Sequence, residues 1–513
     1  MIRLVILILL VAVFPAHAQP AAAPAGFDAR MATEVYVTAL AFMGPRTLEP
    51  VPVGELTTWG LRGLTALDPE LSVAVTNDAL VLALRDRIVA TLPLPPPTAQ
   101  AWGEAAAALA VQANQVSAAV RRAGTEGVLQ AFFDELFNHL DPYSRYVGPS
   151  DAQDDRDQRT GRAGIGVTLA RRGREVVVTA AIPDGPGAEA GIRVGDRIVA
   201  VDGDPARGRD ADDVLDATDG PEGTTVTIEW RGRDRRVRRA DIERATVPPD
   251  TVSAQRLGAL LMLRITSFNH RTDERMSAEI ERALAGPGPP PEGIAFDLRG
   301  NRGGLLRQAV GAANTLLPAG IVATTAGRDP DASRVFRSTG GELATDLPMM
   351  VLVDGRTASA AEIFAAALAD RGRAVVIGSS TLGKGLIQTI APLPDGGELF
   401  VTWSRVLAPR GWPLQSLGVL PQVCTSLGEE ELSRSLHALD AGRAPMAEAL
   451  ARHNRSRAPI PVAEVLAIRS ACPASEGRDS DIAAAKFLMA NPRAYAAALL
   501  PPVGATPVMG ARP

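Results

Sequence analysis

The chain has 513 residues, 46% of them hydrophobic, and a formal net charge of −5 at pH 7. This length gives room for about two to four domains, and the mixed charges are typical of a globular protein rather than a nucleic-acid binder. Aromatic residues make up only 4% of the chain, which argues against an aromatic surface that stacks on bases.

Residues 1–18 have the order of a secretory signal peptide: Arg3, an apolar run over residues 4–14, and the small-residue end AHA. The apolar run is too short to cross a bilayer comfortably, and an uncleaved anchor is the alternative. No later stretch of the sequence is apolar for long enough to span a membrane. We therefore expect an exported protein, periplasmic in a bacterium, whose mature chain begins near Gln19.

Residues 19–150 have a mostly helical pattern. The alanine-rich stretch from Ala99 to Ala123 has few helix breakers and predicts one long helix. The polar segment PSDAQDDRDQRTGR, residues 149–162, then predicts a linker.

Residues 160–246 change to short β-like runs such as GIGVTLA, EVVVTAAI, DRIVAVDG and TTVTIEWRG, with glycines between them. One short helix, Asp210 to Thr218, is closed by Gly220. This segment predicts a separate β-rich domain.

Residues 250–425 alternate strands and helices. The strand runs LLMLRITSF, GIAFDLRG, MMVLVDG and AVVIGSS show little polar alternation, as expected for a sheet covered on both faces. Residues 426–513 are again helical in pattern. The whole chain is therefore predicted to be a multidomain α/β protein.

Two cysteines, Cys424 and Cys472, occur in the chain. In an exported protein such a pair favours a disulfide, and two separate buried thiols are the alternative. The five histidines are scattered and form no HExxH motif or Cys/His cluster, so we expect no metal and no cofactor.

Lys384 lies between two glycines in an otherwise uncharged, largely apolar stretch. A desolvated lysine loses its proton readily and can act as a base. Ser359 precedes a predicted helix, where it is either a simple N-cap or a nucleophile beside the positive end of the helix. The next strand leads to Lys384, so strand–helix–strand geometry predicts that both residues lie at one end of the sheet.

Three further positions fit such a site. Gln388 lies four residues after Lys384, on the same side of a helix or strand, where its amide could hold the amine. The glycine turn at Gly303 and the N–H of Ala360 could form an oxyanion hole. Two glycines before a helix are a weak signal by themselves.

Together, DLRGNRGG, GRTASAAEI and GKGLIQT resemble the carboxy-terminal processing (tail-specific) protease family, serine peptidases with a Ser/Lys dyad. The spacing of 25 residues from Ser359 to Lys384, and of four to Gln388, matches the family pattern. LDPYSRY and GIGV…GAEAGIRVGDRIVAVDG, the latter similar to an embedded PDZ domain, extend the resemblance over roughly residues 134–423. Thr357 and Ala361 stand where the family often has serines, and Arg302 where it usually has proline.

The resemblance implies a helical N-terminal region, a PDZ domain, a protease core of the ClpP/crotonase-like type and a helical tail. It assigns Ser359 as nucleophile and Lys384 as general base. The loop Gly164, Ile165, Gly166 and Val167 would bind the C-terminal carboxylate of a peptide, with helix 210–218 as the opposite wall. The expected partners are protein or peptide substrates with free C-termini.

The pattern leaves open whether an adaptor protein or oligomerisation takes part. Two other interpretations remain at this point: a catalytically inactive PDZ adaptor or scaffold, and a Ser-His hydrolase. No nucleic-acid partner is expected.

Overall fold

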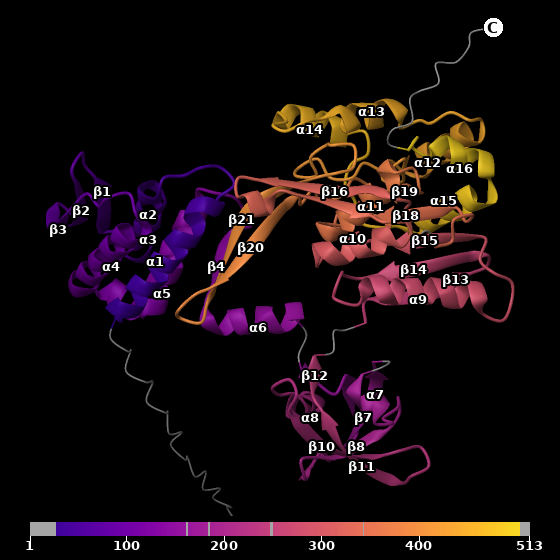
Figure 1. Cartoon of the computed structure of the whole chain (residues 1–513), viewed down its shortest axis with the longest axis horizontal. Helices are drawn as coiled ribbons and strands as arrows, with labels where there is room; N and C mark the ends of the chain where they lie inside the picture. The colour runs from indigo at the N-terminus through magenta and orange to yellow at the C-terminus, as the bar shows by residue number, and fades with distance from the viewer. Residues whose placement is uncertain (1–26, 161–162, 183–184, 247–249, 342, 503–513) are drawn as a thin grey trace, which may run out of the picture. The chain divides into compact units, whose positions relative to one another are not determined.

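A computed structural model of the chain describes residues 27–160, 163–182, 185–246, 250–341 and 343–502 (Figure 1). The predicted signal peptide, residues 1–18, lies outside the described residues. The chain divides into two compact units. One contains the described residues up to 41 and residues 52–140, and the other contains residues 42–51 and the chain from Asp141 onward.

The first unit is helical but also contains a three-stranded sheet. Its helices are the greater part of α1 (Ala29–Arg46), whose last residues belong to the other unit, and α2 (Val53–Leu61), α3 (Gly63–Leu67), α4 (Ala99–Val116) and α5 (Ala118–Asn138). Its strands β1 (Leu71–Val75), β2 (Ala79–Leu84) and β3 (Arg87–Pro93) form an antiparallel sheet in the order β1-β2-β3.

The mostly helical pattern predicted for this region is present, but the prediction did not include β1–β3, which are short β-branched and leucine-rich runs joined by tight turns, one of them with Arg85 at φ 53°. The predicted long helix is two helices, because Ser117 leaves the helical conformation and caps α5 by accepting a hydrogen bond from the Val120 N–H.

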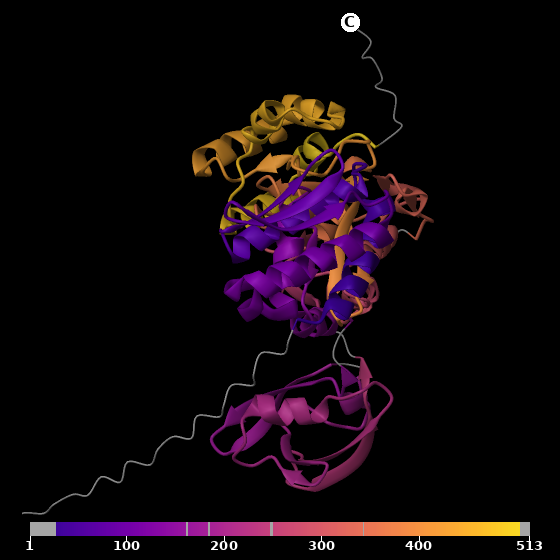
Figure 2. The same ribbon diagram turned by 90° about the vertical axis from the view of Figure 1, so that its left-hand side faces the viewer.

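A β-rich domain occupies residues 163–246 (Figures 1 and 2). Its elements are β5 (Ala163–Gly164), β6 (Val167–Arg172), β7 (Glu175–Ala181), α7 (Pro186–Glu189), β8 (Arg197–Val201), β9 (Asp204–Pro205), α8 (Ala211–Thr218), β10 (Thr225–Arg231), β11 (Val237–Glu243) and β12 (Ala245–Thr246). The main sheet has the order β11-β10-β8-β7-β6, which leaves β6 at one end. Helix α8 packs beside β6, and Val214 of α8 joins the buried core of the domain.

The central sheet of the second unit has the order β13-β14-β15-β18-β19-β22 and is parallel except for the β13–β14 pair. The strands are β13 (Val252–Leu257), β14 (Leu260–Ile265), β15 (Gly293–Asp297), β18 (Met349–Val353), β19 (Ala374–Gly378) and β22 (Val423–Cys424). Alternate residues of each strand point to opposite faces, so Val351 and Leu352 belong to different buried clusters.

Helices cover both faces of this sheet. On one face lie α9 (Thr272–Ala285), α10 (Leu306–Asn314) and α11 (Ala360–Asp370). On the other lie α12 (Glu429–Asp440), α15 (Asp479–Ala490) and α16 (Pro492–Ala498) (Figure 1). The C-terminal tail therefore forms one of the three layers of the core and is not an appendage.

A second sheet in this unit has the order β17-β16-β21-β20, with β4 (Arg145–Val147) also paired to β21. Its strands are β16 (Gly320–Gly327), β17 (Arg334–Ser338), β20 (Leu386–Pro392) and β21 (Glu398–Leu407), with the 3₁₀ turn η1 (Pro330–Ala332) beside them. The remaining helices are α6 (Pro149–Thr160), α13 (Ala447–Arg455) and α14 (Val462–Arg469).

The α/β fold class is confirmed, with two differences before the β-rich domain. The segment from Asp141 pairs with β21, so it belongs to the second unit and not to the N-terminal region ending at residue 150. The predicted linker 149–162 forms helix α6 over most of its length, where Arg156 lies 3.2 Å from the Glu398 carboxylate. Within the described ranges, no helix combines the length and hydrophobicity needed to cross a bilayer.

The buried face of the tail makes a prediction about stability. Leu488 of α15 is 0% exposed in the core, whereas Leu466 of α14 is 64% exposed. Leu488→Ala should lower the free energy of unfolding by about 2–5 kcal/mol, because it leaves a cavity under the sheet. Leu466→Ala is the matched control, and calorimetry should show little change. Equal effects of the two substitutions would contradict the three-layer core.

Candidate active site

The carboxyl ends of β18 and β19 place two loops at one edge of the central sheet. The strands are parallel neighbours, with Val353 opposite Gly378. The loop after β18 leads to Ser359, and the loop after β19 leads to Lys384. The predicted return of the chain to the same end of the sheet is therefore confirmed.

Ser359 has a strained backbone. Its φ of 58° and ψ of −122° lie in a region that residues with a Cβ rarely occupy, and α11 begins at the next residue. Gly303 lies directly against it: a Cβ on Gly303 would be 2.7 Å from the Ser359 Cβ. Only glycine fits there, which explains the first glycine of the pair at 303–304.

Glu362 holds the backbone of both loops. This carboxylate is 0% exposed, and its Oε2 accepts the N–H groups of Ser359, at 2.7 Å, and Lys384, at 2.9 Å. Its Oε1 accepts the Gly383 N–H, at 2.7 Å, and the Thr381 hydroxyl, at 2.5 Å. The backbone nitrogens of Ser359 and Lys384 thus lie within two hydrogen-bond lengths of each other.

Burial raises the pKa of Glu362, and the hydrogen bonds from Thr381, Gly383, Ser359 and Lys384 oppose that rise. As a carboxylate the side chain can accept all four bonds, whereas its protonated form has an O–H that must donate. Sequence analysis did not select Glu362, although S-x-x-E at a helix start is a capping-box signal that could have found it.

Lys384 is half-buried, and burial lowers its pKa, with the charge of Arg145 adding to the effect. Its Nζ lies 4.9 Å from the centre of the Tyr143 ring. The face of an aromatic ring attracts a cation, so the Tyr143 ring stabilises Lys384 when its amine is protonated. Tyr143 and Arg145 both come from LDPYSRY, a motif that the sequence analysis noted without assigning roles to its residues.

LDPYSRY is fixed by Asp141. The Oδ1 of Asp141 accepts the N–H groups of Tyr143 and Ser144, each at 3.0 Å, and the hydroxyl of Thr402 at 2.7 Å. The Gln388 amide donates to the Thr402 Oγ1, at 3.0 Å, and to the Leu386 carbonyl, at 3.3 Å.

The direct contact expected between Gln388 and Lys384 is absent among the hydrogen bonds of the described residues. Gln388 instead supports the loop that carries Tyr143, through Thr402 and Asp141. Gln388 does lie four residues after Lys384, but a β-bulge between Ile387 and Gln388 changes the position of the Gln388 amide in the β20–β21 ladder.

The two predicted halves of the oxyanion hole differ. In the part of the chain that the structure describes, the Ala360 N–H has no hydrogen-bond partner, as expected of the first residue of a helix. The Gly303 N–H, however, donates to the Asn301 Oδ1 at 2.7 Å. The prediction for the Gly303 N–H is therefore wrong for this conformation, because the Asn301 side chain already occupies that donor.

A cavity of about 400 Å³ is lined by residues that follow the Gly303–Gly304 turn and by the residue before Gln388. Leu305 and Leu306, which follow the glycine pair, line it together with Ile387, next to Gln388. Phe336 and Trp403 add further apolar surface. The cavity can therefore accept an apolar side chain.

The predicted peptide loop of the β-rich domain connects β5 to β6. Ile165 is buried, Gly166 has φ 71°, and Val167 begins β6, while Gly164 pairs with Ala245. No acceptor within the described residues takes the N–H groups of Ile165 and Gly166. These donors and the end strand β6 have the properties of a site that adds a peptide strand.

The predicted disulfide joins Cys424 and Cys472, with an S–S distance of 2.04 Å.

Of the histidines, His453 is buried with its Nε2 2.8 Å from the Gly418 carbonyl oxygen, and burial lowers its pKa. His270 is exposed at the cavity. Across the described ranges, no three His, Cys, Asp or Glu side chains are grouped so that they could hold a metal ion.

Glu362→Gln should greatly reduce any activity of this site. An amide can replace only one carboxylate oxygen as acceptor, so two of the four donors lose their partner, at about 1–3 kcal/mol each. Asp370→Asn is the matched control, because Asp370 is equally buried at the other end of α11 and accepts from the Trp412 Nε1–H and the Arg410 N–H. Both variants should unfold at lower temperature, but only Glu362→Gln should lose hydrolysis per folded molecule. Similar rates in the two would refute the positioning role.

Known proteins match this arrangement in both domains. Residues 259–425 match the profile of Peptidase family S41, and residues 177–232 match that of a PDZ domain. The carboxy-terminal-processing protease of Bartonella bacilliformis is 34% identical over 288 residues, which cover 55% of this chain and 66% of that protein. A probable CtpA-like serine protease of Staphylococcus haemolyticus is 30% identical over 298 residues, 57% of this chain and 59% of the relative.

Among solved structures, the photosystem II D1 C-terminal processing protease is 27% identical, with a TM-score of 0.37, and the match covers 74% of this chain and 97% of that one. The chain spans just under two thirds of the length of the curated relatives it matches. The predicted resemblance to the carboxy-terminal processing proteases is confirmed by the S41 match at residues 259–425 and by the PDZ match before it.

Proposed function

We propose that this protein is an exported serine endopeptidase that recognises protein C-termini through its PDZ domain and hydrolyses peptide bonds with a Ser359/Lys384 dyad. One observation carries the proposal: the buried Glu362 carboxylate binds the backbone of both residues through the same oxygen. The family match supports the peptidase reaction.

The reaction begins with a proton transfer. Neutral Lys384 takes the proton from the Ser359 hydroxyl, whose oxygen attacks the substrate carbonyl carbon. The carbonyl oxygen becomes an oxyanion near the Ala360 N–H and the positive end of α11. The Lys384 ammonium, facing Tyr143, then protonates the leaving amine, and water releases the acyl group from Ser359.

The PDZ domain supplies recognition. A substrate C-terminus adds to β6, and its carboxylate accepts the N–H groups of Ile165 and Gly166. The 400 Å³ cavity lined by Leu305, Leu306 and Ile387 takes an apolar side chain of the substrate.

A catalytically inactive PDZ adaptor is the second candidate. It shares the peptide loop but needs neither the strained backbone at Ser359 nor the lowered pKa of Lys384. Those two features cost stability and have no use in an adaptor, so they favour the enzyme.

Ser359→Ala should abolish hydrolysis of casein without unfolding the protein, because the nucleophilic oxygen is lost and the helix start is kept. Gel analysis of casein digestion and circular dichroism measure the two effects. An inactive wild type that still binds C-terminal peptides would support the adaptor instead. Cleavage by Ser359→Ala at the wild-type rate would remove Ser359 as nucleophile.

The hydrolysis rate should rise with pH to a plateau, because only the neutral form of Lys384 is a base. Since burial lowers the pKa of Lys384, the rise should be complete below the usual lysine range near pH ~10.4. Lys384→Arg should be as inactive as Lys384→Ala, because guanidinium stays charged. His437→Ala, an exposed change on α12, should keep the plateau rate, and its failure to do so would point to a histidine base.

A further inference from the structure

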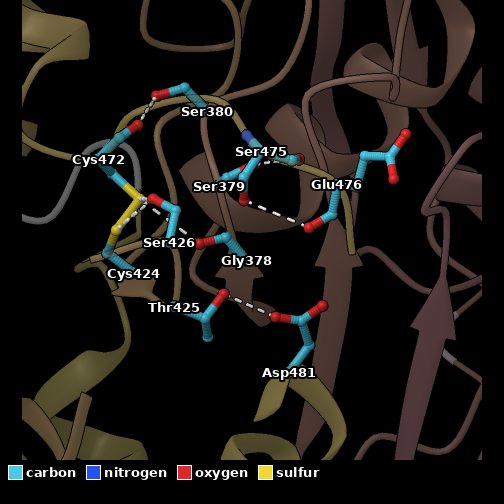
Figure 3. Close-up of a disulfide and its surroundings, with 10 residues drawn as sticks. All are labelled: Gly378, Ser379, Ser380, Cys424, Thr425, Ser426, Cys472, Ser475, Glu476 and Asp481. Atoms are coloured by element: carbon cyan, nitrogen blue, oxygen red, sulfur yellow. Dashed lines mark hydrogen bonds between the residues drawn. A yellow bond between two sulfur atoms is a disulfide. The ribbon is translucent and has the colours of Figure 1, made fainter. Parts of the chain in front are cut away.

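The disulfide lies against the loop that carries the catalytic lysine. Cys424 ends β22, the strand next to β19, and Cys472 belongs to the tail between α14 and α15 (Figure 3). Both are buried, at 4% and 0% exposure. Cys472 lies beyond residues 259–425, so the S41 match does not include it.

The chain around Cys472 forms hydrogen bonds with the loop after β19. The Ser380 hydroxyl and N–H both donate to the Cys472 carbonyl, at 2.6 and 3.3 Å. The Ser379 hydroxyl donates to the Ser475 carbonyl and accepts the Ser475 N–H, each at 3.0 Å (Figure 3). The next residue, Thr381, donates to Glu362. The lysine loop is thus held by the tail on one side and by Glu362 on the other.

The same stretch of tail also holds the loop after β18, which leads to Ser359. The Gly355 N–H donates to the Ser475 carbonyl at 2.7 Å. The Gly477 N–H donates to the Asp354 Oδ2 at 3.3 Å, while the Asp354 Oδ1 accepts the Thr357 N–H at 2.9 Å. Residues 472–477 therefore connect the serine loop to the lysine loop.

We propose that residues 472–477, anchored by the Cys424–Cys472 disulfide, are a positioning element that sets the separation of Ser359 and Lys384. The inference rests on the proposed function for its catalytic consequence. The chemical reason is that Lys384 must meet the Ser359 hydroxyl within hydrogen-bond reach, and a displacement of about 1 Å can cost 100-fold in rate. Without the disulfide, Cys472 loses its covalent anchor, and the two loops can move apart.

The direct test removes the bond with Cys424→Ala/Cys472→Ala, which leaves no lone thiol. We expect kcat for peptide hydrolysis to fall about tenfold or more with KM little changed, because the substrate sites are intact and the dyad is not. The midpoint of the pH–rate profile should move upward, since a loosened loop exposes Lys384 to water and its pKa returns toward the usual value. A lower melting temperature with unchanged kcat and pH midpoint would overturn the proposal.

Two further variants keep the disulfide and decide the question if the double variant fails to fold. Ser379→Ala and Ser380→Ala remove the hydroxyl bonds to the tail and should also lower kcat. Ser470→Ala is the matched control, because its exposed hydroxyl donates to the Ala467 carbonyl at the end of α14, at 2.8 Å. Equal kcat in all three variants would contradict the positioning role.

Hydrogen–deuterium exchange separates this inference from the proposed function. Amides of residues 355–359 and 379–385 should exchange faster in Ser379→Ala and Ser380→Ala than in wild type or Ser470→Ala, whether or not the protein cleaves casein. Unchanged exchange would overturn the inference even if the protease is active. Inactive wild-type protein with faster exchange in the variants would instead overturn the proposed function alone.

Discussion

A single carboxylate that is cut off from water determines the geometry of the site. Glu362 can stay buried as a charged group only if each of its donors is in place, because an unpaired buried charge is far more costly than a paired one. Its donors come from the start of α11 and from the loop after β19. Burying this side chain therefore forces the two loops together before any substrate arrives.

The tail reinforces this arrangement from the opposite side of the sheet edge. A disulfide between cysteines separated by 48 residues stabilises a fold by about 4 kcal/mol in the chain-entropy account. A network of charged side chains also connects the tail to the core. Arg299 lies 2.8 Å from Asp297 and 3.1 Å from Asp481. The other carboxylate oxygen of Asp481 accepts a hydrogen bond from the Thr425 hydroxyl (Figure 3). The segment DLRG, next to the glycine turn, is thus joined to the start of α15.

Much of the site was predictable because it depends on local order along the chain. A strand, a helix with serine at its start and a second strand that leads to lysine can meet only at one sheet edge, so Ser359 and Lys384 followed from pattern. The partner of Gln388 did not, because it depends on a bulge in β20. The partner of the Gly303 N–H could not be predicted either, because it depends on the orientation of the Asn301 side chain. The strands β1–β3 were missed because apolar runs of five to seven residues can belong to a strand or to a helix.

The layered core has a consequence for the order in which the protein is made. Ser359, Glu362 and Lys384 leave the ribosome well before α12, α15 and α16, which cover one face of the sheet beneath them. Until those helices emerge, that face of β14, β15, β18 and β19 is exposed to water, and the contacts from Ser475 and Gly477 do not exist. A nascent chain therefore contains Ser359, Glu362 and Lys384 before it contains the helices that complete the core, so the geometry of the site is reached only after residues 429–498 have emerged.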